Sequence, residues 1–241
     1  MIVGSIKEDL AQEKRVSLTP DTAKNIIGLG LKICVEKEYA THLGVKDEEY
    51  EKIGVEIKSS SSEVLNLSNL IIKVNCPSES EINILKENTI LVGMLNPSKN
   101  KNRIGKIINK KIKLFSLELL PRITRAQSMD VLSSHSNLAV YRAVIECVSE
   151  FQKAVPMMMT AAGTVPAAKV LVIGAGVAGL QAIATAKRLG AIVSATDVRA
   201  ASKEQVESLG GKFLSVDQSE DMETSGGYAK ETSDDYKQKQ T

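Results

Sequence analysis

The segment of residues 170–197 limits the possible folds of this chain more than any other. An apolar strand pattern at its start runs into the sequence GAGVAG at residues 174–179, and a helical pattern follows through residue 189. A second apolar strand, residues 191–195, leads to Asp197, which comes 18 residues after Gly179. A G-x-G-x-x-G sequence between strand and helix, with an acid ~20 residues further on, predicts a dinucleotide-binding βαβ unit.

Each position of the glycine-rich turn has a physical role in such a unit. Gly174 permits a tight turn out of the strand, Gly176 lets a pyrophosphate approach the backbone, and Gly179 lets the helix pack close to the sheet. The helix start, with Val177 and Ala178, presents free N–H groups and the positive end of the helix dipole to phosphate oxygens. A tight turn that holds no ligand is the alternative interpretation.

The acid at the end of the second strand indicates which dinucleotide is bound. Asp197 can accept hydrogen bonds from both hydroxyls of an adenosine ribose, and its charge repels a 2′-phosphate. Val198 and Arg199 follow it directly, and the positive charge of Arg199 tempers the repulsion. The sequence therefore predicts a site for NAD(H) in preference to NADP(H).

Composition excludes several other classes of protein. The 241 residues carry a net charge of +2, which indicates neither nucleic-acid binding nor a membrane-surface role. The three cysteines, Cys34, Cys76 and Cys147, are widely spaced, so a disulfide framework or a zinc site is not expected. Around His42 and His135 the sequence shows no cluster of Cys, His or acids at metal-ligand spacing, and no apolar run approaches the ~20 residues of a membrane helix.

Strand and helix patterns alternate through the chain and predict an α/β protein. We expect two Rossmann-like parallel-sheet domains joined by a long helix: an N-terminal domain, residues 1–128; a connecting helix and linker, residues 129–165; and an NAD-binding domain, residues 166–241. A complete dinucleotide-binding sheet usually has six strands. Only three strand patterns follow residue 165, so we expect the second domain to be incomplete and the chain to be a C-terminally truncated form.

Three local features complete the sequence-based description of the fold. Thr19 and Pro20 predict the N-cap and first position of a helix. The basic run of residues 99–113 is expected to form the solvated face of a helix that buries Ile104, Ile107 and Ile108. The three methionines at residues 157–159 are expected to pack at the domain junction.

Longer stretches of the sequence resemble a known family. PRITRAQSMDVLSSHSNLAVYRAV, which begins at Pro121, and MMMTAAGTVPAAKVLVIGAGVAGLQAIATAKRLGAIVSATDVRA, which begins at Met157, closely resemble the alpha subunits of proton-translocating NAD(P) transhydrogenases. This family is related in fold to alanine dehydrogenase. The resemblance implies that the chain is the NAD(H)-binding component, and that hydride passes directly to NADP+ held by a second component.

The resemblance also implies residues that position the nicotinamide. Arg122, Gln127, Asp130 and Ser133 match the family loop that holds the ring and its carboxamide. A structural ion pair between Arg122 and Asp130, and an exposed Gln127 without a role, are the alternatives. Gly227 and Tyr228 match a mobile loop whose tyrosine closes over the nucleotide, although Tyr228 can equally be an ordinary loop residue.

Partners and competing functions also follow from the resemblance. It implies an NADP(H)-binding component, a membrane-spanning proton-conducting component, a homodimer, and a cytoplasmic location at the inner membrane held through these partners. An alanine-dehydrogenase-like oxidoreductase is one alternative, because Arg15 and Lys73 match the basic substrate-binding residues of that enzyme. However, Asn96 stands where alanine dehydrogenase carries a catalytic His. An inactive fragment of the transhydrogenase subunit is the other alternative.

Overall fold

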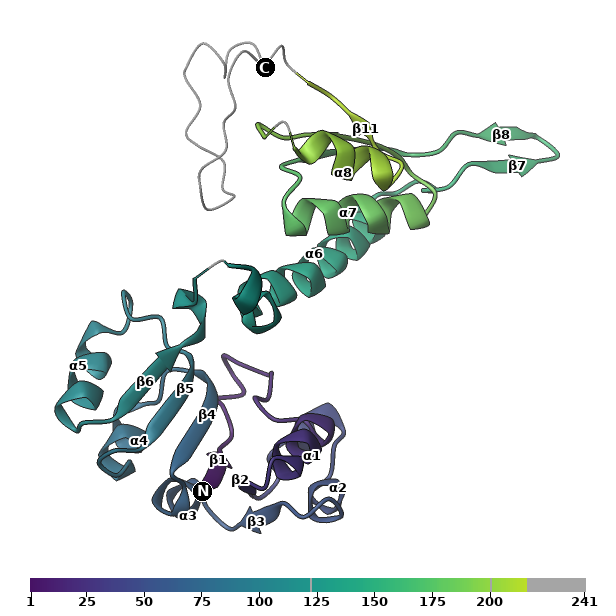
Figure 1. Ribbon diagram of the computed structural model, residues 1–241. Coiled ribbons are helices and arrows are strands. Elements are labelled where there is room, and N and C mark those ends of the chain that lie inside the picture. Colours follow the sequence, from purple (N-terminus) through teal and green to yellow (C-terminus); the bar gives the residue numbers. More distant parts are fainter. Residues whose placement is uncertain (122, 200, 216–241) are drawn as a thin grey trace. The chain divides into compact units, whose positions relative to one another are not determined.

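The computed structural model describes residues 1–121, 123–199 and 201–215 (Figure 1). The chain divides into two compact units, Met1–Met129 and Asp130–Thr241, and each is described by itself.

The first unit is built on a six-stranded, all-parallel sheet of order β3-β2-β1-β4-β5-β6. Its strands are β1 (Ile2–Ser5), β2 (Lys32–Glu36), β3 (Glu56–Lys58), β4 (Leu70–Asn75), β5 (Ile90–Met94) and β6 (Lys113–Ser116). The first strand of the chain lies in the middle of the sheet, because Val3 of β1 pairs with Ile33 of β2 and with Leu70 of β4.

Helices cover both faces of this sheet. The helices are α1 (Pro20–Gly28), α2 (Asp47–Glu51), α3 (Ser61–Leu67), α4 (Glu79–Ile84) and α5 (Lys101–Asn109). One apolar cluster joins Ala23 of α1 and Tyr50 of α2 to Ile33 of the sheet. A second cluster joins Ile82 of α4 and Ile107 of α5 to strand residues that include Ile71 and Leu91. Two cores on one parallel sheet define a doubly wound α/β unit.

Capping residues fix where the helices of the first unit begin. Thr19 caps α1: its hydroxyl accepts from the backbone N–H of Thr22, the Thr22 side chain accepts from the N–H of Thr19, and Pro20 takes the first position. This confirms the helix start predicted from the sequence. Ser78 and Glu81 make the same reciprocal pair at the start of α4.

The second unit begins with the long helix α6 (Val131–Glu150), followed by a hairpin of β7 (Met158–Thr160) and β8 (Gly163–Val165). A parallel sheet of order β11-β10-β9 comes next, made of β9 (Lys169–Ile173), β10 (Ile192–Thr196) and β11 (Lys212–Phe213). Helices α7 (Val177–Arg188) and α8 (Ser202–Ser208) connect these strands. An apolar core of the second unit includes Ile183 of α7, Val193 and Ala195 of β10, and Val206 of α8, with Val144 and Val148 of α6 against it.

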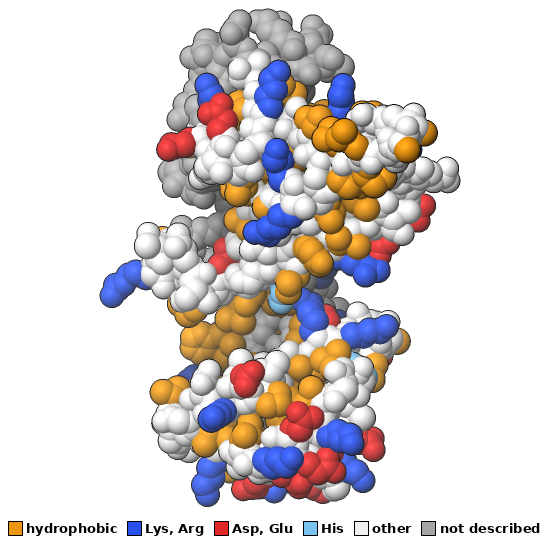
Figure 2. All heavy atoms as spheres, turned by 90° about the vertical axis from the view of Figure 1, so that its right-hand side faces the viewer, with side chains coloured by type: hydrophobic (Ala, Val, Ile, Leu, Met, Phe, Trp, Pro, Cys, Tyr) orange, Lys and Arg blue, Asp and Glu red, His pale blue; other side chains and the backbone are white. Residues whose placement is uncertain are grey.

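The expected α/β class, with a long helix and a smaller second parallel sheet, is confirmed. Three local expectations were wrong. Ile108 is 59% exposed, because it lies on the outer side of α5 while Ile107 is buried. The methionines Met157 to Met159 are exposed beside or on the β7–β8 hairpin, and Met159 is 80% exposed. Figure 2, which faces the hairpin side, shows hydrophobic side chains gathered on the upper part of the visible surface. Helix α3 and the hairpin itself were not predicted.

Among the helices of the described residues, none is both long and apolar enough to cross a membrane.

Candidate dinucleotide site

The turn between β9 and α7 has the geometry that the glycine-rich sequence predicts. Gly174 has φ +92°, a backbone conformation that residues with a Cβ rarely adopt. A Cβ on Gly179 would lie 1.8 Å from the backbone oxygen of Gly174, so only glycine lets the first turn of α7 approach β9 this closely. Both glycines are required by the backbone itself, whatever the turn binds.

The start of α7 is open to a ligand. Gly176 is the N-cap residue and provides no side-chain hydrogen bond to the first turn. A Cβ on Gly176 would have one neighbour within 4 Å, the Arg199 guanidinium at 3.7 Å. Val177 is 44% exposed and Ala178 is partly buried. Unpaired N–H groups of a first turn, reached across a glycine, suit the oxygens of a pyrophosphate.

Asp197 lies at the end of β10 and binds back to the glycine-rich turn. Its Oδ2 accepts the backbone N–H of Ala175 at 2.6 Å, and its Oδ1 accepts the backbone N–H of Arg199 at 2.8 Å. The Arg199 side chain adds Nε to Oδ1 at 2.9 Å and Nη2 to Oδ2 at 3.0 Å. The sheet thus brings the predicted acid of β10 to the predicted turn after β9.

The environment of Asp197 keeps it ionised. Burial, which leaves the residue 8% exposed, raises the pKa of its carboxyl. The hydrogen bonds from the Arg199 side chain and from the backbone N–H groups of Arg199 and Ala175 outweigh burial and hold the pKa below its usual value. A negative acceptor therefore lies beside the start of α7 at neutral pH.

The residues predicted to position the nicotinamide are only partly brought together. Asp130 is the N-cap of α6: its Oδ1 accepts the backbone N–H of Ser133 at 3.0 Å, and its Oδ2 accepts the Ser133 hydroxyl at 2.6 Å. Gln127 is exposed in the 3-10 helix Thr124–Met129 of the first unit. Arg122, Gly227 and Tyr228 lie outside the described residues.

The first unit contains a polar cavity of about 490 Å³. Lys73 of β4 points into it with its side chain 5% exposed, and its ammonium lies 3.1 Å from Glu81 Oε1 and 3.7 Å from Glu8 Oε2. Glu8 also accepts the backbone N–H of Val74 at 2.8 Å. Burial raises the pKa of Glu8 despite the opposing charge of Lys73. Sequence reasoning noted Lys73 but missed both glutamates, although a lysine inside an apolar strand implies buried counterions.

Arg15 and Asn96, the other positions matched to alanine dehydrogenase, are engaged elsewhere in the first unit. The Arg15 guanidinium donates to both carboxylate oxygens of Glu13, at 2.8 and 2.6 Å. These hydrogen bonds lower the pKa of Glu13 to about 2. The Asn96 backbone N–H donates to Glu118.

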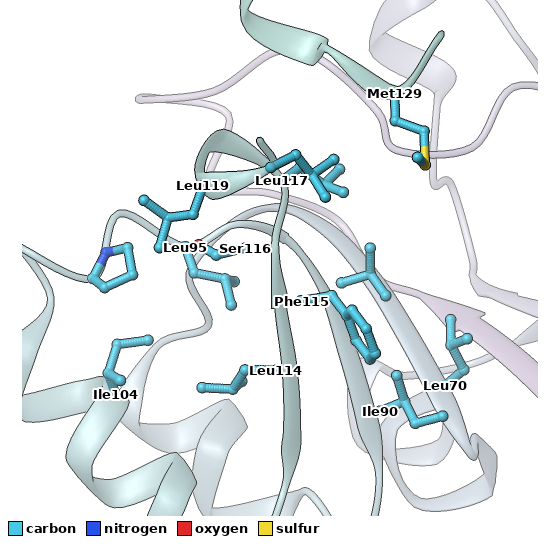
Figure 3. Close-up of a pocket in the computed structure, with 13 residues that line it drawn as sticks. Leu70, Ile90, Leu95, Ile104, Leu114, Phe115, Ser116, Leu117, Leu119 and Met129 are labelled. Carbon is cyan, nitrogen blue, oxygen red and sulfur yellow. The ribbon is translucent and has the colours of Figure 1, made fainter. Parts of the chain in front are cut away.

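A second cavity of the first unit, of about 700 Å³, is apolar (Figure 3). It is lined by residues that include Leu70, Ile90, Phe115, Leu117 and Met129. Ser116 is the one residue with a hydroxyl or charged side chain in this lining, and its buried Oγ has no hydrogen-bond partner among the described residues. A dinucleotide needs several polar partners to fix its orientation, so this cavity does not suit one.

Together, the doubly wound first unit and the strand–turn–helix–strand of the second define an α/β protein with a Rossmann-type βαβ unit. The family model "Alanine dehydrogenase/PNT, N-terminal domain" matches residues 4–139, and "Alanine dehydrogenase/PNT, C-terminal domain" matches residues 143–234. The chain belongs to this alanine dehydrogenase/PNT family.

Individual relatives share the sequence and the fold. The chain is 49% identical over 244 residues to the first of the two-part NAD(P) transhydrogenase alpha subunits of Rickettsia prowazekii (strain Madrid E), an alignment that covers 100% of this chain and 64% of the relative. It is 29% identical over 201 residues to alanine dehydrogenase of Methanococcus maripaludis, covering 82% of this chain and 53% of that protein. The crystal structure of a transhydrogenase from Sinorhizobium meliloti superposes with a TM-score of 0.84 at 48% identity, covering 89% of this chain and 64% of that one. The chain thus spans just under two thirds of its transhydrogenase relatives.

Proposed function

We propose that this chain is the NAD(H)-binding component of a proton-translocating NAD(P) transhydrogenase. It would hold NADH so that hydride passes to NADP+ on a partner component, while a membrane component couples the transfer to proton movement. The similarity to a transhydrogenase alpha subunit of Rickettsia prowazekii supports this assignment over the full length of the chain.

The observation that carries the proposal is the position of Asp197 beside the glycine-rich turn. In the proposed complex, the pyrophosphate lies against Gly174, Gly176 and Gly179 and against the N–H groups of Val177 and Ala178. Asp197, followed by Val198 and Arg199, accepts from the ribose hydroxyls. Its buried negative charge disfavours a 2′-phosphate, so NADH should bind more tightly than NADPH.

The nicotinamide end is proposed to rest on Arg122, Gln127, Asp130 and Ser133, with Gly227 and Tyr228 as a closing loop. The Asp130–Ser133 pair supports this in one respect, because it fixes the carboxylate at the start of α6. Direct hydride transfer between two nicotinamides needs the reacting carbons to be held ~3–3.5 Å apart. It needs no protein acid or base, so these side chains act by orientation and by excluding water.

Partners and location belong to the same proposal. We infer an NADP(H)-binding component, a membrane-spanning component, a homodimer of this chain, and a cytoplasmic location at the inner membrane through the partner components. No charge pattern directs the chain to nucleic acid: acidic and basic side chains are interleaved on the visible face of the first unit (Figure 2).

The alternative, an alanine-dehydrogenase-like activity, is disfavoured by the polar cavity. A substrate carboxylate would need free cationic groups there, but Lys73 is buried between Glu8 and Glu81, and Arg15 is held by Glu13. The amide of Asn96 cannot exchange protons as a catalytic His does. An inactive fragment is the other alternative and makes the opposite prediction for nucleotide binding.

The test is nucleotide binding followed by reconstitution. NADH and NADPH are titrated into the chain, with bound NADH detected by its fluorescence, and hydride exchange is then assayed with the NADP(H)-binding and membrane components added. We expect NADH to bind more tightly than NADPH and exchange to need the partner components. Equal affinities, or robust NADH oxidation with pyruvate and ammonia, would contradict the proposal.

A further inference from the structure

The carboxylate of Asp197 is saturated by donors from its own chain. A carboxylate offers about four lone-pair positions. The backbone N–H groups of Ala175 and Arg199 take two of them, and Nε and Nη2 of Arg199 take the others. A ribose has to donate two hydroxyl hydrogens to the same oxygens, so it finds no vacant acceptor in this arrangement.

The Arg199 guanidinium also occupies the approach to the turn. Its Nη2 lies 3.7 Å from where a Cβ of Gly176 would stand, in space that the missing side chain leaves open. Its side chain is 18% exposed, against 6% for Asp197, so the guanidinium lies on the outer side of the pair. One side chain therefore covers both the predicted ribose acceptor and the predicted pyrophosphate approach.

We propose that Arg199 is a specificity-determining clamp for the nucleotide, which rests on the proposed function above. The clamp is the pair of side-chain bonds, Nε to Oδ1 and Nη2 to Oδ2. It closes on Asp197 in the free protein and releases both oxygens when a nucleotide binds. The two backbone N–H groups stay on Asp197 and keep it oriented for the ribose.

Release of the clamp changes what the site selects. The freed guanidinium remains on a residue two positions from Asp197 and can reach phosphate oxygens, which a planar fork of donors binds well. A 2′-phosphate then meets a cation as well as the Asp197 charge. The clamp therefore narrows the difference in affinity between NADH and NADPH, and its removal should widen that difference.

A purely structural role for Arg199 predicts something else. If the guanidinium only held Asp197 in place and never left it, its loss would weaken the site for NADH and NADPH by the same factor. The ratio of the two dissociation constants separates the two roles, because it does not depend on how well the turn is folded.

The experiment compares wild type with three variants of the full chain. Arg199→Met removes the charge and the clamp, and Arg199→Lys keeps the charge but loses the fork. Arg188→Met removes an exposed arginine at the far end of α7 and serves as the matched control. Dissociation constants for NADH and NADPH are measured at one ionic strength.

We expect Arg199→Met to raise the NADPH-to-NADH ratio of dissociation constants by about tenfold, as loss of one charge contact to phosphate would. Arg199→Lys should stay within about threefold of wild type, and Arg188→Met should match wild type. Equal loss for both nucleotides in Arg199→Met would overturn the clamp and leave the proposed NADH site intact. A wild-type chain that binds no NADH would overturn both.

A second readout does not depend on affinity ratios. The Arg199 Nε–H signal in an ¹⁵N NMR spectrum should move when wild type is saturated with NADH, because its hydrogen bond to Oδ1 is broken. A signal that keeps its position on saturation would show that the clamp stays closed, and would overturn the proposal.

Discussion

The backbone N–H of Ala175 donates to Oδ2 of Asp197 at 2.6 Å, and this bond joins the turn after β9 to the end of β10. Ala175 is fully buried, so its N–H has no access to water. The residue predicted to recognise the ribose is therefore also a structural support of the turn predicted to hold the pyrophosphate.

Replacing Asp197 should affect binding and stability together. Asp197→Ala removes the acceptors for two ribose hydroxyls, so NADH affinity should fall by about 10–100-fold. The unpaired N–H of Ala175 should lower the free energy of unfolding by about 1–3 kcal/mol. Titration calorimetry and urea denaturation measure the two effects.

The control for that change is Asp197→Asn, which keeps one oxygen for Ala175. It should retain most of the stability while binding NADH more weakly than wild type. If Asp197→Ala binds NADH as wild type does, the ribose role is wrong.

Gly179→Ala should disrupt the glycine-rich turn. The added Cβ would fall 1.8 Å from the Gly174 oxygen, a backbone atom that cannot rotate away. We expect a loss of about 3 kcal/mol or more in unfolding free energy and no detectable NADH binding. Thermal melts and fluorescence titration are the measurements.

Gly105→Ala provides the contrast within a helix. Nothing lies within 4 Å of a Cβ at Gly105 in the middle of α5, so alanine should stabilise the chain by up to ~1 kcal/mol. A Gly179→Ala protein as stable as Gly105→Ala would refute the close-packing argument.

The buried lysine of the polar cavity should make stability depend on pH. Lys73→Met leaves Glu8 and Glu81 without their cation, which should cost about 3–5 kcal/mol at pH 7. The pKa of Glu8 is raised in the folded state, and loss of Lys73 raises it further. An acid with a raised folded pKa favours folding at low pH, so the cost should shrink as pH falls through that pKa.

Urea denaturation at pH 7 and pH 5 tests this sign. Lys106→Met removes the cation of an exposed pair with Glu79, so it should change stability by less than ~1 kcal/mol at either pH. A Lys73→Met cost that grows on acidification would mean that the glutamates are not the source of the effect.

Asp130 allows the structural and functional roles of one residue to be separated. Asp130→Ala removes the cap of α6 and should cost ~1 kcal/mol of stability. Asp130→Asn keeps a capping oxygen but loses the charge, so it should remain stable while hydride exchange with the partner components falls. Exchange that is unchanged in Asp130→Asn would remove the carboxylate from the proposed nicotinamide site.

The sequence predicted the parts of this protein that depend on local rules. The α1 start follows from Thr19 and Pro20, and the turn follows from glycines whose backbone tolerates no other residue. Helix α3 was missed because its serine-rich start looks like a loop, although Ser60 caps it through the N–H of Glu63. The hairpin after Met157 was missed because uniformly apolar and small residues show no alternation.

Long-range pairings in the site were beyond sequence reasoning. Glu8 and Glu81 are far from Lys73 in sequence or on a different element, and only the fold brings them to the same ammonium. Asp197 was found because its spacing from Gly179 is typical of a βαβ unit. The orientation of Arg199 depends on a side-chain rotamer, which no residue pattern specifies.

The central position of β1 has a consequence for synthesis of the protein. Ribosomes make β1 first, yet its two neighbours are β2 and β4, and the pairing with Leu70 cannot form until that residue has left the exit tunnel. At ~5–20 residues per second, one edge of β1 waits on the order of 10 s for its partner. During this interval the nascent chain presents an unpaired apolar strand, which makes its first seventy or so residues a natural client of co-translational chaperones.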